Sequence, residues 1–168
     1  AVEGSVSPQE RSAMMIGVSD LRRRLSTASS KIDHLKAQLK SFRVALDRSS
    51  AVAGDSEMRY EQLRQEIFSM EEMVNGKRSS RGFGSSPATI SSRLSMVELG
   101  RVNTWGLTDT QKQQMVYVQV ALEELEPKVD NLFKNDFPAF KKTLLEAGAP
   151  WIPDGLTDTN SDEPEEMD

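Results

Sequence analysis

The sequence has no cysteine and only one histidine among its 168 residues. The absence of cysteine excludes disulfide bonds, thiolate zinc sites and cysteine nucleophiles. Carboxylates alone would have to complete a metal site at His34, so we expect no metal and no other cofactor. Serines are numerous, but none has a base spaced to activate it, and we predict that the chain is not an enzyme.

Aromatic residues make up only 6% of the chain, and no run of 18 apolar residues occurs. The sequence therefore predicts no membrane insertion by this segment. It also has no strong basic stripe, so we expect no nucleic-acid partner. A hydrophobic content of 37%, a charged content of 28% and a mean hydropathy of −0.51 are typical of a helical protein with a thin core and a large hydrated surface.

The net charge of −5 is unevenly distributed along the chain. Residues 154–168 contain seven acidic residues and no Lys or Arg, which leaves 19 acidic and 21 basic residues in the rest. We predict a helical domain over 1–153 and a disordered acidic tail over 154–168. Because the chain begins at Ala1 without a methionine, we expect a processed protein or a piece of a longer one.

Apolar residues between positions 14 and 46 alternate steps of four and three without interruption. They are Met14, Val18, Leu21, Leu25, Ala28, Ile32, Leu35, Leu39, Phe42 and Leu46. This spacing places them on one stripe of a helix, which we predict over 8–48 with Ser7 as its N-cap. So long a helix is not stable alone, and its stripe has to be covered. We expect Arg22, Arg23 and Arg24, which lie off the stripe, to form ion pairs at its edge.

Two shorter helices are predicted next, over about 55–75 and 87–101. Their apolar faces are Tyr60, Leu63, Ile67, Met70 and Val74 in one, and Ile90, Leu94 and Val97 in the other. Ser86 and Pro87 have the pattern of an N-cap and a first helical residue. Together the two helices match the first in length, so we expect one interrupted rod along it.

The last helix is predicted over 109–147, with a capping box at Thr108 and Gln111. Its stripe is Met115, Val118, Leu122, Leu125, Val129, Phe133, Phe137, Phe140 and Leu144. Two consecutive steps of four follow Val129, and prolines 127 and 138 bracket them, so we expect a bend there. The predicted fold is all-α: an elongated antiparallel helical bundle of three rods, with the middle rod split, giving four helices.

Several motifs in the second half are distinctive in their residues. They are Ser86-Pro87-x-x-Ile90-x-x-Arg93-Leu94, Thr108-x-Thr110-Gln111, Glu123-Glu124-x-x-Pro127 and Leu145-Glu146-Ala147-Gly148-Ala149-Pro150-Trp151-x-Pro153. The chain over about 55–155, and more loosely its first helix, resembles the helical C-terminal region of bacterial sortilin-like BNR-repeat β-propeller proteins, often labelled glycosyl hydrolases. The Ala-Gly-Ala-Pro-Trp ending is the most specific part of this resemblance.

The resemblance implies an exported protein of the cell envelope, periplasmic, associated with the outer membrane or extracellular. This bundle would be a non-catalytic accessory or interaction module, part of a carbohydrate-binding or carbohydrate-processing complex. Its partner would be its own upstream β-propeller domain or an envelope protein, and the bundle itself would be a monomer or weak dimer. The catalytic label belongs to the propeller, so no catalytic residue is implied here.

The alternative is a free-standing coiled-coil adaptor or oligomerisation domain that associates through the first helix. An apolar stripe has the same pattern for partners within and between chains, so the pattern alone does not separate the two. The middle and last helices supply enough apolar surface within one chain, which favours a self-contained bundle. The candidate interaction residues are Trp151, Trp105 and Pro150. Pro150 stiffens the segment that carries Trp151, which would either cap the bundle end or anchor a partner.

Overall fold

The computed structural model describes residues 6–49, 54–76, 88–100, 106–149 and 152. In these ranges the chain is all-α and contains no strand. The elements are α1 (Pro8–Arg48), α2 (Asp55–Asn75), α3 (Ile90–Leu99), α4 (Asp109–Asn131), the π-helical turn η2 (Leu132–Asp136) and α5 (Phe137–Glu146).

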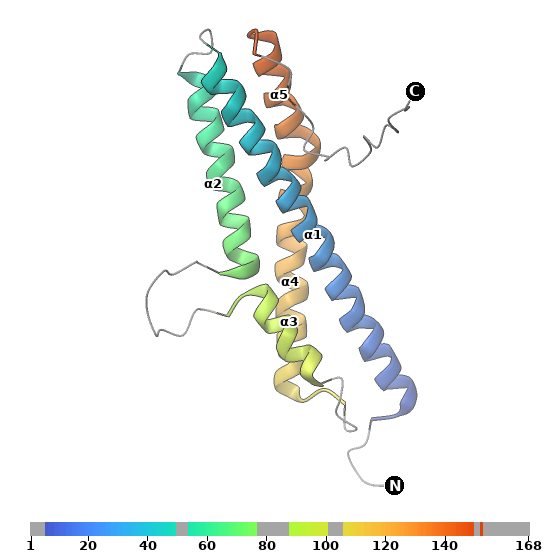
Figure 1. Ribbon diagram of the computed structural model, residues 1–168. Helices are drawn as coiled ribbons and strands as arrows, with labels where there is room; N and C mark the ends of the chain where they lie inside the picture. The colour runs from blue at the N-terminus through green and yellow to red at the C-terminus, as the bar shows by residue number, and fades with distance from the viewer. Residues whose placement is uncertain (1–5, 50–53, 77–87, 101–105, 150–151, 153–168) are drawn as a thin grey trace, which may run out of the picture.

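The helices pack as three rods, as Figure 1 shows. α1 extends along the whole bundle, and α2 and α3 follow one another along it in the reverse direction. α4, η2 and α5 form one continuous rod beside α1, which runs in the same direction as α1 and opposite to α2 and α3. The prediction of an elongated antiparallel bundle with a split middle rod is confirmed.

The predicted caps at two helix starts are present. The Ser7 hydroxyl accepts a hydrogen bond from the Glu10 amide at 3.2 Å, and Glu10 accepts one from the Ser7 amide at 3.0 Å. Thr108 and Gln111 form the same reciprocal pair, at 3.2 and 2.9 Å. These side chains satisfy amides that the first helical turn leaves without partners, which fixes where α1 and α4 begin.

Gly148 ends the last rod, as predicted. Its φ is +87°, a left-handed conformation that glycine adopts without strain. The Ala149 amide donates to the Leu144 carbonyl at 3.0 Å and the Gly148 amide to the Leu145 carbonyl at 3.1 Å. This pair of bonds is a Schellman motif, and it turns the chain away from the axis of α5.

The core follows the predicted stripes along most of the bundle. On α1 every predicted stripe residue is buried except Met14, which is partly buried against the core. Leu35 and Phe42 on α1, and Leu63 on α2, are fully buried. The long α1 stripe is therefore covered within the chain, which stabilises a helix that could not persist alone.

α3 begins later than predicted. Ala88 and Thr89 lie outside the helix, and its N-cap is Thr89 instead of Ser86. The Thr89 hydroxyl accepts from the Ser92 amide at 3.1 Å, and the Ser92 hydroxyl accepts from the Thr89 amide at 2.8 Å. Ser86-Pro87 and Thr89 both have residue types that favour a helix start. The reciprocal hydrogen bonds with Ser92 make Thr89 the N-cap of α3.

The predicted place of Phe133 in the core is wrong. Phe133 is 36% exposed, whereas Leu132 is 1% exposed and takes the core position. The π turn follows, in which the Phe137 amide donates to the carbonyl of Leu132, five residues back. A π turn holds one residue more than an α turn. The two steps of four expected from Val129 to Phe137 are therefore replaced by a step of three, from Val129 to Leu132, and a step of five, from Leu132 to Phe137.

Candidate functional site

The three predicted interaction residues, Trp105, Pro150 and Trp151, lie outside the described residues. Ile152, which follows them, is described and is 1% exposed. The chain therefore returns to the core after the Schellman motif. At the other end of the bundle, the buried Leu107 precedes α4.

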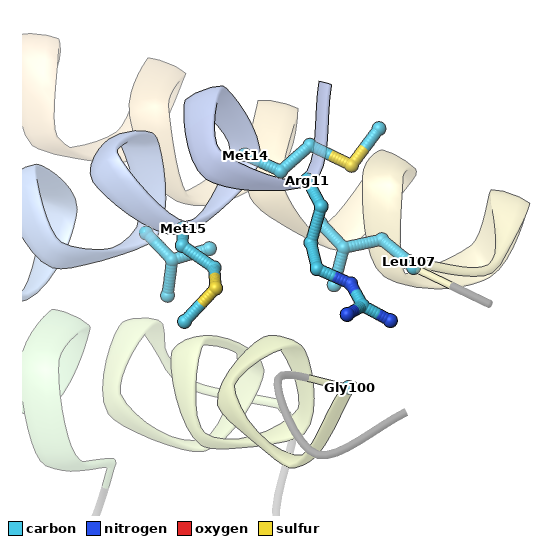
Figure 2. A pocket seen from close by; sticks show the side chains of 7 residues that line it. Arg11, Met14, Met15, Gly100 and Leu107 are labelled. Atoms are coloured by element: carbon cyan, nitrogen blue, oxygen red, sulfur yellow. The ribbon is translucent and has the colours of Figure 1, made fainter. Parts of the chain in front are cut away.

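A small cavity lies where the start of α1 meets the end of α3. Its lining is mostly apolar and comprises Arg11, Met14, Met15, Val18, Gly100, Gly106 and Leu107. Figure 2 shows Arg11 and Met15 extending from α1 toward the chain at Gly100. The cavity volume is about 20 Å³, which is room for roughly one water molecule. It is too small for a metabolite, but flexible methionine side chains around it can rearrange.

Two exposed apolar side chains are chain neighbours of residues that line this cavity. Ile16 on α1 follows Met15 and is 67% exposed, and Leu99 on α3 precedes Gly100 and is 75% exposed. Met15, which is 37% exposed, lines the cavity and also the neighbouring groove that Ile16 lines. We call Met15, Ile16 and Leu99 the end surface. Sequence reasoning missed it, although Ile16 and Leu99 are large apolar residues that lie off the predicted stripes.

The basic triplet of α1 forms ion pairs, as expected. Arg22 donates two hydrogen bonds to Glu98 of α3, at 2.8 and 2.6 Å. Arg24 pairs with Glu126 of α4, and Arg23 with Asp20 of its own helix. Arg22 and Arg24 thus connect the first rod to each of the other two, and the carboxylates raise the pKa of both guanidinium groups.

A second polar cluster surrounds the π turn. The Lys31 ammonium donates to Asp130 at 2.6 Å and lies 6.0 Å from the Phe133 ring centre. His34 packs its ring against Phe133, with the ring centres 5.2 Å apart and tilted by 50°. Arg59 of α2 lies 3.5 Å from Asp136. The π turn therefore directs Phe133 outward, onto polar side chains of α1.

The Lys31–Asp130 pair should make stability depend on acidity. The hydrogen bond from Lys31 lowers the pKa of Asp130 below its ordinary value. A lowered pKa in the folded state contributes stability above the unfolded pKa and loses it as the pH falls through the folded pKa. Asp130→Asn should therefore lower the free energy of unfolding at pH 7, by less than ~1 kcal/mol for so exposed a pair.

Urea denaturation at pH 7 and at pH 2 checks this prediction. The difference between Asp130→Asn and the unmodified protein should be smaller at pH 2 than at pH 7, because the contribution of the carboxylate is lost as it becomes protonated. Asp33→Asn is the matched control, since Asp33 is exposed on α1 and makes no ion pair among the described residues. An equal loss at both pH values would show that Asp130 acts through packing instead of charge.

The ion pairs between different rods are spread along the bundle, as those of Arg22, Lys31 and Arg59 show. Across the described ranges, no group of three His, Asp or Glu side chains could hold a metal ion. Nor does any helix in the described part of the chain have the length and apolar character to cross a lipid bilayer. The geometry thus offers paired charges that orient helices, together with exposed apolar surface that could bind another chain.

Comparisons with protein-family models, with curated proteins and with solved structures find no match to this chain.

Proposed function

We propose that this helical bundle is a non-catalytic interaction module and that the end surface is where it binds its partner. The observation that carries the proposal is the exposure of Ile16 and Leu99, each next in the chain to a residue that lines the apolar cavity, Met15 and Gly100. Met15 and Ile16 line one groove on α1, and exposed apolar patches are a feature of protein–protein contact sites. Met15 and Met14 beside them can adapt their shape to a partner.

We propose further that the bundle is an accessory of an exported cell-envelope protein that binds or processes carbohydrate. This part is supported by the motif resemblance alone. Gly148 has a local reason to be present, because its positive φ ends α5. Any helix that ends in a Schellman motif favours glycine at the position of Gly148, so this glycine is weak evidence for the resemblance. Pro150 and Trp151 are the more specific evidence.

The alternative, a free-standing adaptor or oligomerisation domain, would need a surface other than the α1 stripe. That stripe is buried against the other helices of the same chain, with Leu35 and Phe42 at 0% exposure. An adaptor would therefore bind through the outer faces of the rods or through the end surface.

Site-specific photocrosslinking tests the proposal. The photoreactive residue p-benzoylphenylalanine replaces Leu99 in the natural full-length protein, and Met58 in a matched control. Met58 is 61% exposed and lies in the first turn of α2, at the opposite end of the bundle. We expect crosslinks from position 99 and none from position 58, identified by mass spectrometry of the linked peptides.

The identity of the crosslinked peptide separates the alternatives. A link to a β-propeller domain of the same protein, or to an envelope protein, supports the accessory role. A link to an unrelated protein supports a free-standing adaptor. Equal crosslinking from positions 99 and 58, or none from 99, would show that the end surface is not a binding site.

A further inference from the structure

The outer face of α4 carries a short stripe that the core does not use. Lys112, Val116, Val120 and Glu123 are spaced by four, four and three residues, which places them on one side of the helix. Val116 is 60% exposed and Val120 is 58% exposed, and both charged residues are exposed as well. Val118 and Leu122, which point into the core, are fully buried.

The charges at the two ends of this stripe form no ion pair in the described part of the bundle. Neither Lys112 nor Glu123 makes an ion pair among the described residues, and Glu123 accepts only a 3.4 Å hydrogen bond from Gln119. On the same helix, Glu126 and Asp130 each pair with a base on α1. Glu123 also lies near enough to Arg24 to help raise the pKa of that guanidinium. The outer stripe thus has a positive end, an apolar centre and a negative end, and among the described residues neither end charge forms an ion pair.

We propose that this stripe binds a second copy of the same chain, with the two α4 helices antiparallel. The midpoint of the stripe lies near Val118, about 9 Å along the axis from Lys112 and about 7.5 Å from Glu123 at 1.5 Å per residue. Reversing one helix about this midpoint places Lys112 of each copy opposite Glu123 of the other. A parallel arrangement would instead bring like charges together.

Tyr117 extends the apolar centre on one flank of the stripe. It is 49% exposed, and the Arg93 guanidinium of α3 lies 3.7 Å from its ring centre. Arg93 is itself held by a 2.6 Å hydrogen bond to Gln114. The Tyr117 ring is therefore fixed before any partner arrives, and pairing Lys112 with Glu123 brings position 117 of one copy level with position 118 of the other.

The size of this surface makes the dimer weak. Stable complexes bury roughly 800 Å² per partner, and three exposed apolar side chains over little more than one helical turn offer much less. We therefore expect association with a dissociation constant between ~10 µM and ~1 mM. Such a dimer forms at high local concentration and separates on dilution.

Sedimentation equilibrium of the full chain over a concentration series tests the proposal. Lys112→Glu and Glu123→Lys, made singly, should each weaken dimerisation by about tenfold, because each places like charges opposite one another twice. The double variant Lys112→Glu/Glu123→Lys should restore it, since the pairs reform with their signs exchanged. Val116→Ser should abolish dimerisation, whereas the control Val44→Ser, at a 47% exposed position on α1, should not change it.

Circular dichroism should show that all of these variants keep their helix content, since every substituted side chain is exposed. A protein that stays monomeric up to millimolar concentration would overturn the proposal. So would a dimer that neither charge exchange weakens. Single exchanges that weaken the dimer, with no recovery in the double variant, would overturn the antiparallel pairing.

Discussion

Deleting Glu124 from α4 is expected to unfold the bundle. Each α-helical residue turns the chain by about 100°, so one deletion rotates everything beyond it relative to the rest of the helix. The buried residues displaced are Leu125, Val129 and Leu132 and, unless the π turn closes to an α turn, also Phe137, Phe140 and Leu144. Each contributes about 1.5–3 kcal/mol through burial, and together they match the whole stability of about 5–15 kcal/mol that a domain of this kind has.

Deleting Lys134 instead should leave the bundle folded. Lys134 is exposed and lies in the π turn, and its side chain makes no hydrogen bond or ion pair among the described residues. Removing it changes the step of five between Leu132 and Phe137 to four, so a regular α-helix keeps Phe137 in the core. The deletion should be combined with Pro138→Ala, because proline inside a regular helix costs about 3 kcal/mol.

Far-UV circular dichroism and urea denaturation distinguish the two deletions. We expect native helix content and a cooperative transition for the Lys134 deletion with Pro138→Ala, and neither for the Glu124 deletion. Pro138→Ala alone is the control for the proline. If both deletions unfold the protein equally, then the extra residue of the π turn cannot be removed without disrupting the core.

The second large effect is expected for Phe42→Ala, which should lower the free energy of unfolding by about 3–5 kcal/mol. Phe42 is fully buried on α1, and its ring centre lies 5.4 Å from that of Phe137 and 5.1 Å from that of Phe140. The Phe42–Phe140 pair is edge-to-face, an arrangement that adds to the gain from burial. Truncation leaves a cavity between α1 and α5 that neighbouring side chains fill only partly.

Val44→Ala is the matched control for Phe42→Ala. Val44 lies two residues away on α1 and is 47% exposed, so its truncation should change stability by less than ~0.5 kcal/mol. Urea denaturation at one pH and temperature compares the three proteins. A loss below ~1 kcal/mol for Phe42→Ala would mean that the aromatic cluster does not hold α5 on α1.

The stripes on α1 and α2 could be predicted because their spacing alone selects one face of a helix. Val18 and Leu21 on α1, like Leu63 and Ile67 on α2, needed no knowledge of the partner helix. The π turn could not be predicted in this way. Steps of four and four, or of three and five, both join Val129 to Phe137, and Leu132 and Phe133 are both apolar. Packing against α1 decides between them, and packing is not local in the sequence.

The interaction surfaces illustrate the same limit. That Arg22 would pair with an acid was predictable from its place beside the stripe, but its partner Glu98 is 76 residues away and depends on how α3 lies on α1. The end surface and the outer stripe of α4 had a signal in the sequence, since Ile16, Val116 and Val120 are apolar residues off the core stripes. That these side chains are exposed could be established only from the arrangement of the three rods.

The split middle rod also has a consequence for the order in which the protein folds. α1 with α2, and α3 with α4, are neighbours in the sequence, so each pair can form by closing a short loop. Contacts between α1 and α4 join residues about 100 positions apart, as Arg24 and Glu126 show. We expect the two helical hairpins to form early and to dock late, with the ion pairs between α1 and α4 absent from the transition state. Those pairs would then slow unfolding and hardly affect how fast the protein folds.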